Sequence, residues 1–216
     1  MSMLASDNGG QEIEKLENGV YTAVSSAIID LGLQKNEKFE KVQRKFMLIW
    51  NILGEEVEIN GEKLPRTINK EYSFSLHEKS ALRKDLQAWR GKAFSEEELQ
   101  GFNILTILNK ACQLQIILEE KNNKKYNNIA GIMSLPKGTQ IESLENTYYF
   151  DMEDAKTWGN YCKISNWIKE KIKKAENLES TGFSKYLKEY EESLKEQQIE
   201  QEKDKEMLAP EDDLPF

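Results

Sequence analysis

Residues Phe39 to Leu53 alternate between apolar and polar side chains, and this two-residue period constrains the fold more than any other feature of the sequence. Neighbouring side chains of a β-strand point to opposite faces, so the pattern predicts one long central strand. One face of this strand is apolar apart from Arg44. The other face is more polar and carries Lys41 and Lys45, so we expect it to point outward.

Four other segments have the composition of strands. The first is rich in β-branched residues, but its alternation slips, which predicts a bent or bulged strand that ends near Gly32. Asn60-Gly61 is the signal for a two-residue hairpin turn before the third strand. A polar turn at residues 121–125 separates the last two strands. The predicted strands span Val20 to Leu33, Phe39 to Leu53, Arg66 to Leu76, Cys112 to Glu120 and Tyr126 to Leu135.

Between the third and fourth predicted strands, the apolar residues Leu82, Leu86 and Trp89 recur at helical spacing, which predicts a helix. Ser95 and Glu98 form a capping box that begins a second, short helix. The resulting order, three strands, a helical region and two strands, is the connectivity of the OB-fold, a five-stranded barrel. Other small barrels and mixed sheets share this order. We expect a mainly β fold with helices, with an OB-fold barrel at residues 19–140.

The rest of the chain differs from this barrel in composition. Residues 1–18 are polar and predict a flexible arm, and residues 141–190 carry apolar residues at helical spacing among lysines, which predicts a helical extension. Residues 191–216 are rich in Glu, Gln and Lys and predict a disordered acidic tail. The net charge of −8 therefore combines a mildly basic body with a strongly acidic tail.

Signals for an enzyme are weak. His77 is the only histidine and begins a predicted helix, which excludes a site built from several histidines. The sequence has no phosphate-binding loop and no dinucleotide-binding turn. Cys112 and Cys162 are far apart and are expected to be reduced thiols. We expect a non-catalytic protein that needs no cofactor or metal. The absence of a membrane span or a signal sequence predicts a cytoplasmic location without membrane association.

Cations and aromatic residues are interleaved on the predicted strands, and proteins that bind single-stranded nucleic acid use this combination for backbone phosphates and unstacked bases. Lys41, Lys45 and Lys70 are the candidates for phosphate contacts. Tyr72 and Trp50 are candidates for base stacking. Trp50 and Phe74 share their strand face with apolar residues, which favours packing in the core.

Two further groups of basic residues could contact nucleic acid. Lys124, Lys125 and Tyr126 lie at the turn between the fourth and fifth strands, one of the two loops through which an OB-fold holds oligonucleotides. Arg90 belongs to a basic cluster on the predicted helix, for which a solvated helix face is the alternative interpretation.

The sequence ends in Asp212-Asp213-Leu214-Pro215-Phe216, an acidic segment with a terminal aromatic residue and no apolar segment around it. A partner with a basic pocket could attract the carboxylates, bury the Phe216 ring and pair with the terminal carboxylate. We interpret these residues as a protein-binding tip. An acidic tail that only increases solubility is the alternative.

This ending resembles the acidic Asp-Asp-Ile-Pro-Phe-like tip of bacterial single-stranded DNA-binding proteins, with Leu214 in place of Ile. The run from Asn69 to Phe102 is similar to a family of phage-encoded single-stranded DNA-binding proteins with an OB-fold core. Further similarity lies in Leu135-Pro136-Lys137-Gly138 and in Asn166 to Ile172. The likeness covers about Gly19 to Ala175, and Asn109 and Ala111 depart from the family pattern.

The resemblance implies sequence-independent binding of single-stranded DNA in phage replication or recombination, inside the host cytoplasm. It also implies that the acidic tip recruits replication or recombination proteins. The sequence leaves open a second hypothesis, a protein-interaction module or inhibitor that captures host replication factors through the tip without binding DNA. A homo-oligomer is possible through an edge strand or the helical extension.

Overall fold

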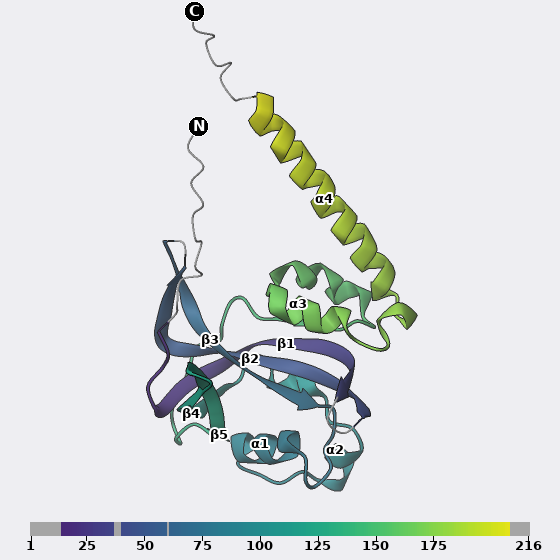
Figure 1. Ribbon diagram of the computed structural model, residues 1–216. Coiled ribbons are helices and arrows are strands. Elements are labelled where there is room, and N and C mark those ends of the chain that lie inside the picture. The colour runs from purple at the N-terminus through teal and green to yellow at the C-terminus, as the bar shows by residue number, and fades with distance from the viewer. Residues whose placement is uncertain (1–13, 37–39, 60, 208–216) are drawn as a thin grey trace, which may run out of the picture.

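The computed structural model describes residues 14–36, 40–59 and 61–207 (Figure 1). Its centre is a curled, antiparallel half-barrel with the strand order β3-β2-β1-β4-β5. The mainly β fold with helices is therefore confirmed. No pairing joins β3 to β5 within the described residues, so the sheet is open along that side. The strands are β1 (Gly19–Asn36), β2 (Lys41–Ile59), β3 (Glu62–Ser73), β4 (Ala111–Lys121) and β5 (Lys124–Met133).

Strand β1 is bent, as its slipped alternation predicted. Its register against β2 shifts between Ser25 and Ala27 and again between Asp30 and Gly32. The strand continues to Asn36, so the prediction that Gly32 ends it was wrong. Gly32 instead has a left-handed φ of +68° within the second bulge, a conformation that glycine adopts without steric cost.

Both hairpin predictions are confirmed. Ile59 pairs with Glu62 across the first turn, and Lys121 pairs with Lys124 across the second. Asn122 and Asn123 both have positive φ, of 52° and 57°, as expected for the turn type that fits the twist of a hairpin.

Two helices follow β3 and cover one side of the half-barrel (Figure 1). Helix α1 (Ala81–Arg90) begins at Ser80, whose hydroxyl accepts a hydrogen bond from the Arg83 backbone N–H, and buries Leu82, Leu86 and Trp89. Helix α2 (Glu96–Gln100) has the predicted capping box. The short helix η1 (Ile104–Ile107) leads to β4. These elements close an apolar core inside the half-barrel.

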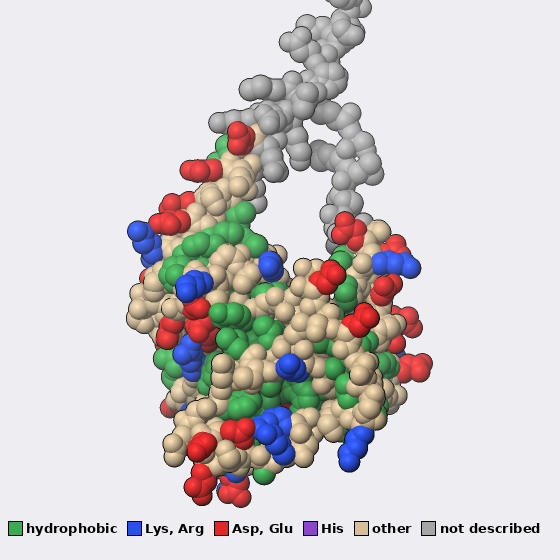
Figure 2. Space-filling view, turned by 180° about the vertical axis from the view of Figure 1, so that it is seen from behind, with side chains coloured by type: hydrophobic (Ala, Val, Ile, Leu, Met, Phe, Trp, Pro, Cys, Tyr) green, Lys and Arg blue, Asp and Glu red, His purple; other side chains and the backbone are tan. Residues whose placement is uncertain are grey.

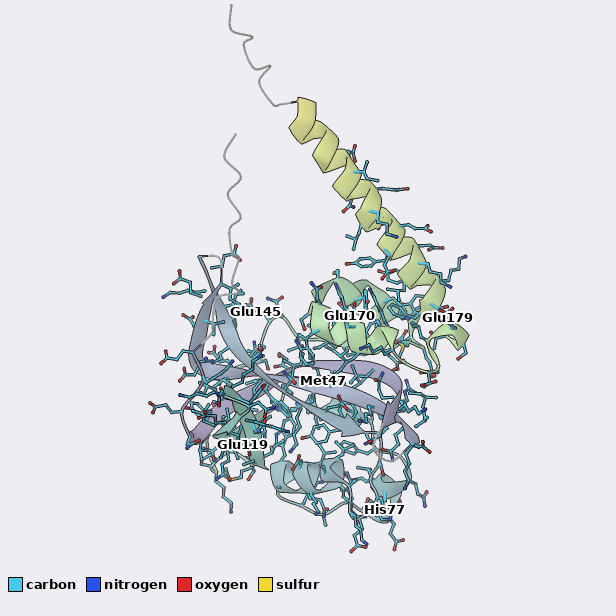
Figure 3. All side chains as sticks on the ribbon, viewed as in Figure 1. Met47, His77, Glu119, Glu145, Glu170 and Glu179 are labelled. Carbon is cyan, nitrogen blue, oxygen red and sulfur yellow. The ribbon has the colours of Figure 1, made fainter. Side chains whose placement is uncertain are left out.

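The C-terminal extension packs on the outer face of the sheet. It consists of β6 (Tyr148–Phe150), which pairs in parallel with β1, and of η2 (Ala155–Lys163), α3 (Asn166–Lys173), η3 (Leu178–Ser180) and α4 (Phe183–Met207). Met47 of β2 lies under α3 (Figure 3) and belongs to a second apolar core shared with the extension. The β2 face that was predicted to point outward is therefore covered at this point.

The two ends of the described chain are more ordered than predicted. Leu16 is buried, and its backbone N–H and C=O both bond to the Asn127 side chain at 2.8 Å, so residues 14–18 are not a loose arm. Helix α4 continues to Met207 and extends away from the body (Figure 1), although disorder was predicted from residue 191. Glu, Gln and Lys are good helix formers, so a segment rich in these residues can be helical.

We expect Gly32→Ala to destabilise the protein by about 2–4 kcal/mol, because it combines a positive φ with a steric clash. A Cβ at this position would lie 2.2 Å from Met152 Cε and 2.8 Å from Ala175 Cβ. Gly54→Ala is the matched control, since Gly54 has a φ of +80° and no atom within 4 Å of the added carbon. Urea unfolding measures the free energy of unfolding of both variants. Equal losses of stability in the two variants would contradict the close packing of the extension on β1.

Candidate nucleic-acid interface

An open groove of about 830 Å³ lies between the β2–β3 hairpin and β5, on the side where the half-barrel is not closed. Its described lining contains three cations, Lys15, Arg66 and Lys163, and no Asp or Glu. The groove is therefore basic in a protein whose net charge is −8. Tyr126, which is 46% exposed, adds an aromatic ring.

Four separate segments bring these side chains together. Arg66 lies on β3 and Tyr126 on β5, the two edges of the sheet. Lys15 is held beside them because the neighbouring Leu16 is bonded to Asn127 of β5. Lys163 is the last residue of η2 in the extension, and its Nζ lies 5.5 Å from the centre of the Tyr148 ring.

The salt bridges of Glu71 hold the extension beside this groove. Glu71 on β3 accepts hydrogen bonds from Lys45 Nζ at 2.7 Å and from Lys171 Nζ at 2.5 Å. Burial by itself would raise the pKa of Glu71, but the two ammonium groups outweigh it and lower the pKa below its ordinary value. Lys171 belongs to α3, so these bonds fix the helix that begins just after Lys163 and Ser165.

Three of the basic residues predicted to contact nucleic acid are instead engaged in ion pairs away from the groove. Lys45 bonds to Glu71, and Lys70 Nζ lies 2.7 Å from Asp85 Oδ2 on α1. Arg90 pairs with Glu98, and its guanidinium lies 4.5 Å from the centre of the Phe94 ring. These cations hold elements of the fold together and do not line the groove.

The stacking predictions for Trp50 and Tyr72 are corrected by their burial. Trp50 is 0% exposed and packs against Trp89, while Tyr72 is 3% exposed and donates its hydroxyl to Asp85 at 2.7 Å. Burial raises the pKa of Tyr72, and Asp85 raises it further. A base cannot reach either ring because α1 covers this side of the sheet. Phe74, for which core packing was favoured, is 44% exposed.

The remaining predicted nucleic-acid contacts, Lys41, Lys124, Lys125 and Tyr126, are exposed, and their positions differ. Tyr126 lines the groove. Lys125 lies opposite Glu120 on β4 and lines a separate hollow that contains several carboxylates. Lys41 and Lys124 form no ion pair within the part of the chain that the structure describes. The predicted tip, Asp212, Asp213, Leu214, Pro215 and Phe216, lies outside the described residues.

The sequence interpretation missed Lys15, Arg66 and Lys163. Lys15 was assigned to the flexible arm, and Lys163 was one of several lysines in the extension. Arg66 was recognised only as the start of a strand. Within the sequence no periodic pattern connects these residues, because they meet only when β3, β5 and the extension come together.

The described residues contain no group of His, Cys, Asp and Glu side chains that could hold a metal ion. His77 is exposed, lies at the end of the molecule opposite α4 (Figure 3) and accepts a hydrogen bond from the Lys79 backbone. No helix in the described part of the chain is long and apolar enough to cross a membrane.

Comparisons with protein families and with curated proteins identify no relative. No model of a protein family matches the chain. A search of curated proteins also yields no significant match.

We expect Glu71→Gln to destabilise the protein by about 1–2 kcal/mol at neutral pH, because Lys45 and Lys171 lose a charged acceptor. The lowered pKa means that Glu71 stabilises the fold above its unfolded-state pKa and loses this effect as the pH falls through its folded pKa. The difference from the wild type should therefore shrink below about pH 4. Urea unfolding at pH 7 and at lower pH measures this difference in the free energy of unfolding. The exposed Glu58→Gln is the control, and a pH-independent difference would contradict the assignment.

Proposed function

We propose that this protein binds single-stranded DNA without sequence preference, through the groove between β3 and β5. The observation that carries the proposal is a groove with three cations, an exposed tyrosine and no acidic residue in its described lining. Cations along a groove attract the phosphate backbone, and an aromatic face stacks on any base. Neither contact reads the base sequence.

The connectivity of the sheet supports an OB-like assignment. Strand β1 pairs with both β2 and β4, and α1 lies between β3 and β4 in the chain. OB-folds are partly open barrels that bind oligonucleotides over strands 2 and 3 and beside the loop between strands 4 and 5. The groove lies between the corresponding elements, β2–β3 and the start of β5.

The open shape and the polarity of the groove suit a segment of single-stranded DNA. Arg66 and Lys163 could contact successive phosphates, with Lys15 at the β5 side and Tyr126 stacked on a base. Asn51 and Asn69 supply amide groups on the β2–β3 side. The described lining contains no carboxylate that would repel the backbone.

The biological role that we propose is in phage DNA replication or recombination, and it rests on the resemblance of the sequence. In this proposal the groove holds DNA, and the acidic tip at Asp212 to Phe216 recruits partner proteins. In this proposal the two activities are separable, because the groove lining and the tip share no residue. A protein that used only its tip to capture host replication factors would not need a basic groove.

We expect the triple variant Lys15→Glu, Arg66→Glu, Lys163→Glu to bind a labelled oligo-dT at least about tenfold more weakly than the wild type and with a smaller salt dependence. The control reverses Lys79, Lys84 and Lys156, which are exposed and do not line the groove. Both variants carry the same net charge. Fluorescence anisotropy at two salt concentrations, with a duplex competitor, measures the binding.

Equal losses in the two triple variants would place the DNA elsewhere on the surface. If the folded wild type does not bind at low salt, with or without residues 208–216, the protein does not bind single-stranded DNA and the tip-only hypothesis replaces this proposal. Circular dichroism checks that each variant is folded.

We expect Tyr126→Ala to weaken oligo-dT binding by about 5- to 150-fold, the range for loss of one base stacked on an aromatic ring. Tyr126→Phe should retain most of the affinity, because it keeps the ring and removes only the hydroxyl. Quenching of protein fluorescence and anisotropy can be read in the same titration. If the Phe variant loses as much affinity as the Ala variant, the ring does not stack on a base.

A further inference from the structure

A second cavity, of about 260 Å³, lies beyond the end of β3, away from the basic groove. Phe102, Ile104 and Leu105 from the segment around η1 form one side. Tyr149 and Phe150 of β6 form another side, and Phe74 lies just after β3. The cavity is therefore built where the α2–η1 segment meets the first strand of the extension.

Large apolar side chains are exposed around this cavity. Phe74 is 44% exposed and Leu105 is 38% exposed. One side of the Phe74 ring packs on Phe46 with a centroid distance of 4.7 Å, and the Arg44 guanidinium lies 5.3 Å from its centre. Figure 2 shows hydrophobic patches bordered by charged side chains on the body. Apolar surface at a concave site is typical of binding sites.

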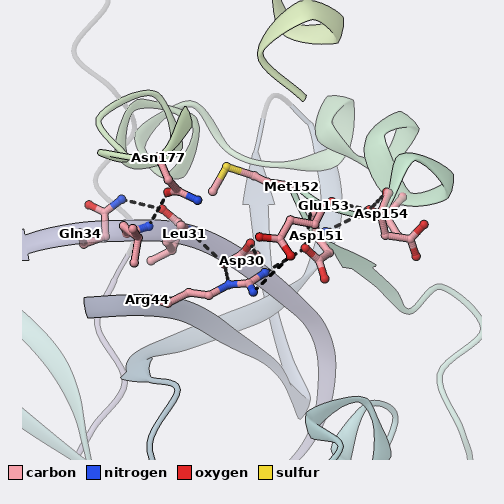
Figure 4. A network of polar contacts seen from close by, with 12 residues as sticks. Asp30, Leu31, Gln34, Arg44, Asp151, Met152, Glu153, Asp154 and Asn177 are labelled. Carbon is pink, nitrogen blue, oxygen red and sulfur yellow. Dashed lines mark hydrogen bonds and ion pairs between the residues drawn. The ribbon is translucent and has the colours of Figure 1, made fainter. Parts of the chain in front are cut away.

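The polar part of the cavity carries excess negative charge (Figure 4). Arg44 is paired with Asp30 at 2.9 Å, Asp151 at 3.1 Å and Glu153 at 3.6 Å. Asp154 lies beside them and accepts a hydrogen bond from the Tyr149 hydroxyl. One guanidinium therefore faces several carboxylates.

Asp30 and Asp151 are the carboxylates in the described lining of the cavity, and one of their four oxygens is still available. Both oxygens of the buried Asp30 accept hydrogen bonds, from the Gly32 backbone and from Arg44. The Oδ1 atom of Asp151 accepts from Arg44 and from the Glu153 backbone. Its Oδ2 atom accepts no hydrogen bond from the described residues. Asp151 lines the cavity, so this oxygen can receive a donor from a bound group.

We propose that this cavity docks a Lys or Arg side chain, together with a neighbouring apolar residue, from a partner protein. The aliphatic stem of the basic side chain packs on Phe74 and Leu105, and its charged head donates to Asp151. Long basic side chains combine an apolar stem with a cationic head in this way. The acidic rim disfavours DNA and the acidic tip of this chain, so the occupant is a basic segment of another protein.

The test uses three capped tripeptides, acetyl-Leu-Arg-Phe-amide and its Gln and Glu counterparts, added to the full-length protein. Changes in amide chemical shifts in two-dimensional NMR show which residues lie near the bound peptide. We expect the Arg peptide to shift signals around Phe74, Leu105 and Asp151 and to bind about tenfold more tightly than the Gln peptide. The Glu peptide should bind most weakly.

Leu105→Ser should weaken binding of the Arg peptide severalfold, whereas Ile199→Ser, at an exposed apolar residue of α4, should not. Oligo-dT should not displace the peptide, because the basic groove is separate. Equal binding of the three peptides, an equal effect of both substitutions, or no binding of the Arg peptide at about 10 mM would each overturn the proposal. None of these outcomes depends on whether the protein binds DNA.

Discussion

The burial of β1 on both faces is the constraint on which the rest of the structure depends. All residues from Ala23 to Gly32 are buried, because alternate side chains enter the core inside the half-barrel and the core under the extension. Such a strand needs partners for its backbone and for any charge that it carries. Strands β2, β4 and β6 supply the backbone partners. Arg44 pairs with Asp30, the carboxylate within the buried run.

The extension is therefore part of the fold and is not an appendage of the barrel. It covers β1 and β2, and the ion pairs of Arg44 and Glu71 fasten it to the sheet. The same attachment brings Lys163 to the open side of the half-barrel. If the extension were a tail separate from the barrel, Lys163 would not be held at the groove. The proposed DNA groove depends on the extension as much as on the strands.

The two proposed binding sites have opposite charge. The groove between β3 and β5 has cations without acids in its described lining, whereas the cavity beside β6 has a carboxylate excess around Arg44. A polyanion and a basic protein segment would therefore each be attracted to a different site. In this arrangement a partner could bind without competing for the groove. The total charge of −8 indicates neither site, because each depends on local charges.

The sequence by itself determined the order of the five barrel strands and α1 along the chain, both hairpins and the capping box, because these features depend on residues close together in the chain. It also identified Tyr126 as a candidate for the site. Only the tertiary structure decided that α1 covers Tyr72, that Lys45 is paired with Glu71, and that Lys163 lies beside the groove. Alternation shows which side chains share a face of a strand. What covers that face, and which charges meet there, depends on segments distant in sequence.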